Sequence, residues 1–444
     1  MHIKRSLSDV DGKEIFEIVH ANHFEGQFTP PGDKSISHRA LILGALASGI
    51  SHFAGCSTCL DVNSTRIALT QLGIRIETIS PTDICIHGAG GPRNLCPPLT
   101  SIDCGNSGTT ARLLLGLLPA APFESHITGD ASLRQRPMGR VLEPLRAMGA
   151  HFAEEAGSGR LPLRILGPHI LHGLPLTLAV PSAQVKSAIL LAGAFAEGET
   201  TLTEPWSLRD HTERLLSAMN ANFDRSGNIC CIRGGSPLNP VDLHIPGDPS
   251  AAAFLAVAAA IHPGSRLIIR NVSINPTRLG FLDVLRRMGT EIRIFPTEND
   301  TWEPIGEIEI RHRPLSGTSI GLSEVPGIID ELPVLAVAMA LADGSSHVTG
   351  AGELRVKESD RISTLVAEFR AFGIEIDEHP DGYSLYGKAR PIAPKTVRPQ
   401  TDHRIAMALT ILGTASEGVT QIGGIDCIAI SFPNFAEVLG EACR

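Results

Sequence analysis

Several cations in this 444-residue chain stand beside turns rich in Gly, Ser and Thr, where they could bind an anion. Lys34 and Arg39 follow the turn Pro30–Gly32 and precede the apolar run Ala40–Ala47, so we expect them at the start of a helix. A helix N-terminus carries unpaired amides and partial positive charge, and two added cations strengthen its attraction for an anion. The stretch is not a Walker A loop, because Asp33 stands where that motif has glycine before its lysine.

The same stretch also fits an ordinary capped surface helix, and its local sequence favours neither interpretation. Ser35 and Ser37 could cap the helix, and Gly49 could end it in a left-handed turn. A similar arrangement recurs where Arg112 follows the loop 106–109.

Acidic residues that could transfer protons stand in two further segments. Asp330 directly precedes an apolar helix, where it could be an N-cap or a general base, and both interpretations stay open. In the charged segment 352–361, Lys357 and Arg361 would share a face if the segment is helical, with Glu358 beside them.

The composition limits the class of ligand. The net charge is −9 and only 4% of residues are aromatic, which argues against nucleic acid and anionic membranes as partners. Cations gathered at helix starts in an acidic chain therefore predict a small, strongly anionic ligand. The longest fully apolar run, Ala251–Ile261, is too short to span a bilayer.

The nine cysteines are scattered and match no disulfide framework, which favours a reduced, cytoplasmic enzyme. One Cys-x-x-Cys pair, Cys56 and Cys59, has no second pair to complete a zinc site. We therefore expect no metal and no cofactor.

A pattern of about 70 to 80 residues recurs six times, which predicts six small α/β modules with two helices each, in two groups of three. Each module pairs a polar turn and an apolar helix with a second element that ends in Gly or Asn. The second elements end at Gly73, Gly149, Asn220, Gly289, Gly373 and, in a degenerate copy, Gly440.

Seven motifs together resemble the 5-enolpyruvylshikimate-3-phosphate synthase family, in its bacterial class II branch, over about residues 28–433. They are PGDKSISHRA, GNSGTTARLL, GDASLRQRPMGR, PSAQVKSA, IIDELP, LRVKESDRI and TDHRIAM. The resemblance implies a two-domain inside-out α/β barrel built from six βαβαββ repeats, three per domain. One domain would comprise residues 1–32 and 248–444 and the other 33–247, with the active site in the cleft between them.

The family transfers the enolpyruvyl group of phosphoenolpyruvate to the 5-hydroxyl of shikimate 3-phosphate, through a tetrahedral intermediate, and releases phosphate. This places the chain in the shikimate pathway to chorismate and the aromatic amino acids. By resemblance the catalytic residues are Asp330, Glu358 and Lys34. The shikimate 3-phosphate ligands are Lys34, Ser35, Arg39, Ser182, Gln184, Asp330 and Lys357, and the phosphoenolpyruvate ligands are Lys34, Gly108, Arg136, Gln184, Arg361 and Arg404.

Two departures from the family pattern bear on these assignments. Ile430 stands where some members carry a lysine, and Ala183 stands where another branch has serine. Tolerant class II enzymes carry alanine at the position of Gly108, so the glycine predicts inhibition by glyphosate.

The alternatives are the sister transferase that acts on UDP-N-acetylglucosamine and a non-catalytic anion-binding protein on the same fold. The loop 132–136 lacks the cysteine of the sister enzyme, and a pure binding protein gains nothing from Asp330 and Glu358 among its cations. We expect a monomer that binds only these small-molecule substrates.

Overall fold

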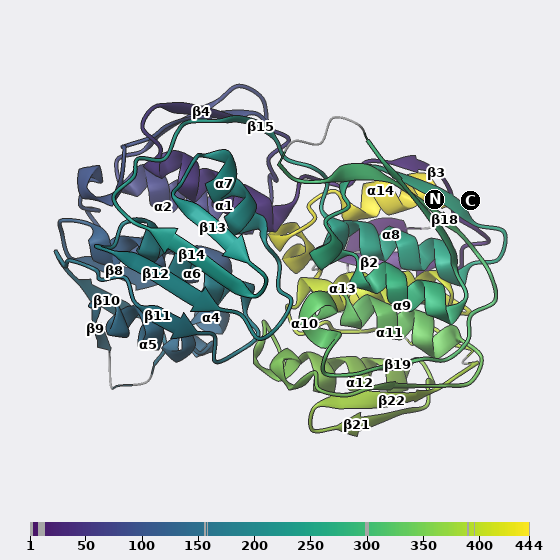
Figure 1. Cartoon of the computed structure of the whole chain (residues 1–444). Coiled ribbons are helices and arrows are strands. Elements are labelled where there is room, and N and C mark those ends of the chain that lie inside the picture. The colour runs from purple at the N-terminus through teal and green to yellow at the C-terminus, as the bar shows by residue number, and fades with distance from the viewer. Residues whose placement is uncertain are drawn as a thin grey trace. The chain divides into compact units, whose positions relative to one another are not determined.

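A computed structural model describes residues 3–7, 14–154, 157, 159–297, 302–388, 390–394 and 396–443 (Figure 1). The chain divides into two compact units. We call residues 32–245 the central unit, and residues 1–31 with 246–444 the terminal unit.

The central unit contains three four-stranded sheets with one common pattern, in which the first two strands are parallel and the others antiparallel. Their orders are β15 (Asp242–His244), β4 (Ile50–Ala54), β6 (Ile84–His87), β5 (Arg75–Thr78); β7 (Ile102–Asp103), β8 (Ser125–Thr128), β10 (Leu163–Leu166), β9 (His151–Glu154); and β11 (Pro175–Thr177), β12 (Glu199–Thr203), β14 (Ile229–Arg233), β13 (Phe223–Ser226). The helices are α1 (Lys34–Leu46), α2 (Leu60–Gln71), α3 (Gly108–Leu117), α4 (Ala131–Gln135), α5 (Gly139–Ala147), α6 (Ala183–Ala194) and α7 (His211–Ala218).

The terminal unit repeats the pattern in two sheets and varies it in the third. Their orders are β3 (Glu25–Phe28), β16 (Arg266–Ser273), β18 (Ile305–Arg311), β17 (Glu291–Pro296); β19 (Ser319–Ile320), β20 (Ser345–Val348), β22 (Gly382–Tyr386), β21 (Ile376–His379); and β1 (Ile3–Leu7), β2 (Glu14–Val19), β23 (Val419–Gly423). The helices are α8 (Pro249–Ile261), α9 (Gly280–Met288), α10 (Val325–Ile328), α11 (Leu332–Leu341), α12 (Arg361–Ala371), α13 (His403–Thr414) and α14 (Phe435–Ala442).

The order of strands explains why the sixth repeat is degenerate in sequence. In the last module the N-terminal hairpin of β1 and β2 pairs with β23, where a complete module would supply its own last two strands. Strands β3 and β15 each stand first in the order of their sheet, and each comes just before the chain passes from one unit to the other. The predicted succession of six α/β modules, three in each unit, is confirmed.

Two kinds of helix alternate in the modules, as their composition requires. The first helix of each module is buried over most of its length: α8 is buried from Pro249 to Ala260, and α6 buries even the charged Lys186. In five modules the second helix ends at the recurring Gly or Asn because the chain turns there with positive φ, from 56° at Asn220 to 118° at Gly289. The predicted end at Gly440 is wrong, because α14 continues through this glycine to Ala442.

The start of α1 differs in detail from the expectation. Its N-cap is Asp33, whose carboxylate accepts from the Ile36 N–H at 2.8 Å, rather than a serine. The helix ends at Leu46 with Ala47 extended, so Gly49 does not form its cap. Among the described residues, no helix is long and apolar enough to cross a membrane.

Candidate functional site

Arg39 is held by three neighbours in the central unit. Its Nε donates to Thr212 Oγ1 at 2.7 Å, its Nη2 to Ser187 Oγ at 2.8 Å, and its Nη1 to the Ser35 carbonyl at 2.8 Å. The guanidinium is buried in the first turns of α1, against α6 and α7. The acceptors in these three bonds are hydroxyl and carbonyl oxygens, which orient the guanidinium.

Gly108, Arg136 and Gln184 come together around the start of α3. The site of a Cβ on Gly108 lies 2.6 Å from Arg112 Nη1 and 3.4 Å from Arg136 Nη1, so the two guanidinium groups lie against the glycine. Arg112 Nη1 donates to Gln184 Oε1 at 2.8 Å, and Gln184 Nε2 donates to Thr109 Oγ1 at 2.8 Å. These two bonds fix the orientation of the Gln184 amide.

Arg136 ends α4, and its Nη2 donates to Asn106 Oδ1 at 2.6 Å and to Ser132 Oγ at 3.2 Å. Like Arg39, it is buried and held by neutral oxygens. Ser182 is the N-cap of α6, where its hydroxyl accepts from the Val185 N–H at 3.4 Å.

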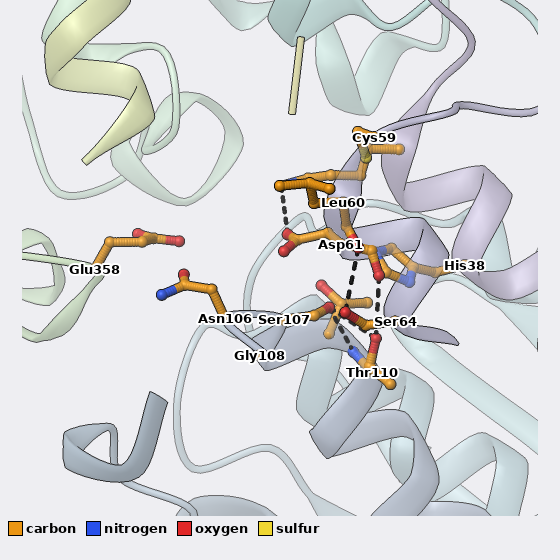
Figure 2. A network of polar contacts seen from close by, with 12 residues as sticks. His38, Cys59, Leu60, Asp61, Ser64, Asn106, Ser107, Gly108, Thr110 and Glu358 are labelled. Atoms are coloured by element: carbon orange, nitrogen blue, oxygen red, sulfur yellow. Dashed lines mark hydrogen bonds and ion pairs between the residues drawn. The ribbon is translucent and has the colours of Figure 1, made fainter. Parts of the chain in front are cut away.

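Lys34 begins α1, and its ammonium donates to Asp61 Oδ2 at 2.9 Å. Asp61 belongs to α2, and its backbone carbonyl accepts from Thr110 Oγ1 at 3.4 Å. Thr110 Oγ1 in turn lies 2.7 Å from Ser107 Oγ, the N-cap of α3 (Figure 2). Lys34 is thereby linked to the loop that carries Gly108.

His38 extends this network into the core of the central unit. Its Nδ1 lies 2.7 Å from Thr65 Oγ1, which lies 2.7 Å from Thr110 Oγ1. Burial, with added repulsion from Lys34 and Arg39, holds the pKa of His38 well below its usual value. The ring is therefore neutral at pH 7.

In the terminal unit, three cations surround Asp330. Its Oδ1 lies 3.9 Å from Lys357 Nζ and 3.5 Å from Arg361 Nη1, and its Oδ2 lies 3.8 Å from Arg404 Nη2. Arg404 Nη1 also donates to the backbone carbonyl of Asp330 at 3.0 Å. Asp330 is not the N-cap of α11, because Glu331 occupies that position.

Arg361 is the most strongly paired cation of this set. Its Nη2 donates to Glu358 Oε2 at 2.5 Å and its Nε to Asp402 Oδ2 at 2.8 Å. Although burial works in the other direction, Asp402, Glu358 and Asp330 raise the pKa of Arg361 above its usual value. Burial lowers the pKa of Lys357, an effect that Asp330 opposes.

The helical arrangement considered for Lys357 and Arg361 is wrong. A 3-10 helix runs from Gly352 to Val356, Lys357 follows it in a non-helical conformation, and α12 begins only at Arg361. The two cations nevertheless reach the same carboxylate, because the bent segment directs both toward Asp330.

Three residues outside the predicted catalytic and ligand sets hold predicted ones in place. They are Arg112 beside Gln184, Asp61 beside Lys34, and Asp402 beside Arg361. Arg112 and Asp402 lie within motifs that had been singled out, so their position was a usable signal. Asp61 offered none, because it lies 27 residues from Lys34 in an unremarked helix.

The chain matches the sequence model of the family described as EPSP synthase (3-phosphoshikimate 1-carboxyvinyltransferase) over residues 19–439. Relatives with the name 3-phosphoshikimate 1-carboxyvinyltransferase include that of Carboxydothermus hydrogenoformans, 48% identical over 94% of this chain and 96% of the relative. That of Acidithiobacillus ferrooxidans is 46% identical over 94% and 95%.

A solved EPSP synthase from Acinetobacter baumannii has a TM-score of 0.84 at 40% identity, covering 97% of this chain and 98% of that one. The enolpyruvyl transferase NikO from Streptomyces tendae has a TM-score of 0.78 at 18% identity, covering 97% of each, and supports the fold alone. These likenesses confirm the predicted fold class, the two-domain inside-out α/β barrel. The chain belongs to the EPSP synthase family of enolpyruvyl transferases.

Proposed function

We infer that the chain is a 3-phosphoshikimate 1-carboxyvinyltransferase of the shikimate pathway to the aromatic amino acids. Family membership over nearly the whole chain supports this activity. The enzyme moves the enolpyruvyl group of phosphoenolpyruvate to the 5-hydroxyl of shikimate 3-phosphate and releases phosphate. Both substrates carry a phosphate and a carboxylate, which accounts for the cations in both units.

In this proposal, shikimate 3-phosphate is bound by Lys34, Ser35, Arg39, Ser182, Gln184, Asp330 and Lys357. Support comes from Arg39, which three hydrogen bonds hold in one orientation in the first turns of α1. Phosphoenolpyruvate is bound by Lys34, Gly108, Arg136, Gln184, Arg361 and Arg404. This second set is supported by the guanidinium groups of Arg112 and Arg136, which lie against Gly108 and place positive charge at the start of α3.

Asp330 serves as the base in the addition step. It takes the proton of the 5-hydroxyl as that oxygen bonds to C2 of phosphoenolpyruvate, while C3 receives a proton from Glu358, with Lys34 as the alternative donor. The C2–O bond to phosphate then breaks, C3 returns its proton, and the alkene re-forms. Three cations near Asp330 stabilise the carboxylate and the anions that meet it, and this cluster is the observation that carries the mechanism.

Phosphate release from phosphoenolpyruvate, with and without shikimate 3-phosphate, tests the activity, with the product checked by mass. We expect release only when both substrates are present. Asp330→Asn keeps the shape of the side chain and should lower kcat by about 10²- to 10⁴-fold. No release by a folded wild-type enzyme would refute the inference, and UDP-N-acetylglucosamine would be the next acceptor to try.

We further propose that the two domains are residues 1–32 with 248–444 and residues 33–247, and that the enzyme acts as a cytoplasmic monomer. The nine cysteines form no disulfide with one another, which suits a reducing compartment. Light scattering of the purified enzyme tests the oligomeric state, and a mass of twice 47.2 kDa would contradict it.

A further inference from the structure

A buried cluster of four charges lies in the central unit, outside the proposed ligand sets. Lys186 has no exposed side-chain surface, and its Nζ lies 2.8 Å from Glu204 Oε2 and 2.6 Å from Glu213 Oε1. Arg225 reaches the same two carboxylates, at 3.0 Å from Glu213 Oε1 and 3.4 Å from Glu204 Oε1. The cluster joins α6, the end of β12, α7 and β13.

The chemistry of the cluster argues against a metal site, although ligand atoms of Glu204, Glu213 and Cys230 lie within 4.8 Å of one another. The ammonium of Lys186 already contacts both carboxylates, and Arg225 makes the cluster neutral. Burial raises the pKa of Cys230 to about 11, so its thiol keeps its proton at pH 7. The four charges therefore pair with one another, although Lys186 Nζ, Glu204 Oε2 and Glu213 Oε2 meet no hydrogen-bond partner in good geometry.

The residues next to the cluster in sequence are the two that hold Arg39. Ser187 follows Lys186 on α6, and Thr212 precedes Glu213 on α7. Ser187 Oγ donates its only hydrogen to the Ala183 carbonyl at 2.7 Å, so in its 2.7 Å contact with Thr212 Oγ1 the threonine is the donor. Each hydroxyl then has a lone pair directed at Arg39.

Burying two ion pairs is a poor way to gain stability, because an apolar substitute of the same volume often does as well. What such a cluster does supply is a fixed distance between the helices that carry it. Lys186 and Glu213 join α6 to α7 directly beside the two hydroxyls, and α1, which carries Arg39, contacts α7 as well.

We propose that Lys186, Glu204, Glu213 and Arg225 are positioning residues that set the spacing of α6 and α7, so that Ser187 and Thr212 hold the Arg39 guanidinium toward the phosphorylated cyclic substrate. The identity of that substrate rests on the proposed function. The positioning residues touch neither substrate, and they act through Arg39.

Glu213→Gln tests the proposal, because it keeps the size of the side chain and removes one charge of the cluster. We expect the Kd for shikimate 3-phosphate, measured by calorimetry, to rise about tenfold. The KM for phosphoenolpyruvate and kcat at saturation should stay within about twofold. Glu154→Gln is the matched control: it breaks the ion pair with Arg146 in the same unit and should leave the Kd unchanged.

A double-mutant cycle separates positioning from a general loss of stability. Thr212→Val removes the hydroxyl that holds Arg39 Nε, so adding Glu213→Gln to it should raise the Kd much less than in the wild type. If the Glu213→Gln variant does not fold, the double variant Lys186→Met, Glu213→Gln takes its place in the cycle, because it keeps the cluster neutral. Full additivity, or an unchanged Kd in a folded variant, would overturn the proposal. A wild-type enzyme that does not bind shikimate 3-phosphate would instead refute the proposed function.

Discussion

Gly108→Ala places a methyl group where the structure has a guanidinium. The new Cβ would lie 2.6 Å from Arg112 Nη1, so this group must move by about 1 Å to reach an ordinary contact distance. That movement breaks the 2.8 Å bond from Arg112 to Gln184 Oε1. A hydrogen bond from a charged donor is worth about 1.5–3 kcal/mol, which corresponds to about 10- to 150-fold in affinity.

The expected result is a KM for phosphoenolpyruvate that rises about tenfold or more, with the Kd for shikimate 3-phosphate less affected. Folding should not suffer, because Gly108 opens α3 without a positive φ and alanine suits a helix better than glycine. We propose that glyphosate inhibits the wild-type enzyme at micromolar concentration and that Gly108→Ala abolishes this inhibition.

Gly139→Ala is the control, since Gly139 opens α5 in the same unit and its Cβ would meet nothing within 4 Å. Steady-state kinetics and glyphosate titrations on both variants decide the matter. Unchanged constants in Gly108→Ala would refute the role of Arg112, as would an equal change in Gly139→Ala. A wild-type enzyme that needs millimolar glyphosate would refute the predicted sensitivity.

Three further variants test the roles of His38, Arg361 and Glu358. His38 binds a proton near pH 6.5 in the unfolded chain but only at lower pH in the folded protein. Its contribution to the free energy of unfolding is therefore complete above pH 6.5 and falls on acidification by up to about 1.4 kcal/mol per pH unit. Between pH 7 and pH 5, the Tm of His38→Gln should therefore decrease by less than the Tm of the wild type. An equal decrease in both proteins would contradict this expectation. Arg361→Met leaves the buried Asp402 carboxylate without its 2.8 Å partner and should lower the free energy of unfolding by about 3–5 kcal/mol. The urea midpoint should fall, and adding Asp402→Asn should restore part of the loss. An unchanged midpoint would contradict this role of the ion pair. Glu358→Gln should lower kcat by about 10²- to 10⁴-fold and slow the uptake of deuterium at C3 of phosphoenolpyruvate. A normal rate of uptake would instead assign the role of proton donor to Lys34.

The repeat could be predicted from the sequence because it depends on local rules. An all-apolar run such as Ala251–Ile261 must be buried, and a Gly or Asn after Leu-x-x-Met marks a chain reversal with positive φ. The degenerate sixth copy could not be resolved in this way. Its missing strands come from the other end of the chain, through the pairing of β2 with β23, and no local pattern reports so distant a partner.

The candidate site shows the same division between local and distant information. Motifs identified cations and acids, but not which carboxylate faces which cation. Lys357 and Arg361 reach Asp330 through a bent segment rather than along one helix, and Asp61 meets Lys34 only because α2 packs on α1. Positioning residues such as Glu213 are harder still, since they touch the candidate ligands only through a neighbour.

The hydrogen bonds that orient Arg39 and Arg136 in the central unit differ in kind from those that orient Arg361 in the terminal unit. In the central unit, hydroxyl and amide oxygens accept from Arg39 and Arg136 and orient their guanidinium groups. In the terminal unit, the carboxylates of Glu358 and Asp402 accept from Arg361, and these bonds hold Glu358 beside Asp330. The two kinds of bond suit two tasks, because hydroxyl and amide oxygens orient a guanidinium for a ligand, whereas a carboxylate pair fixes the acid that is proposed to transfer a proton.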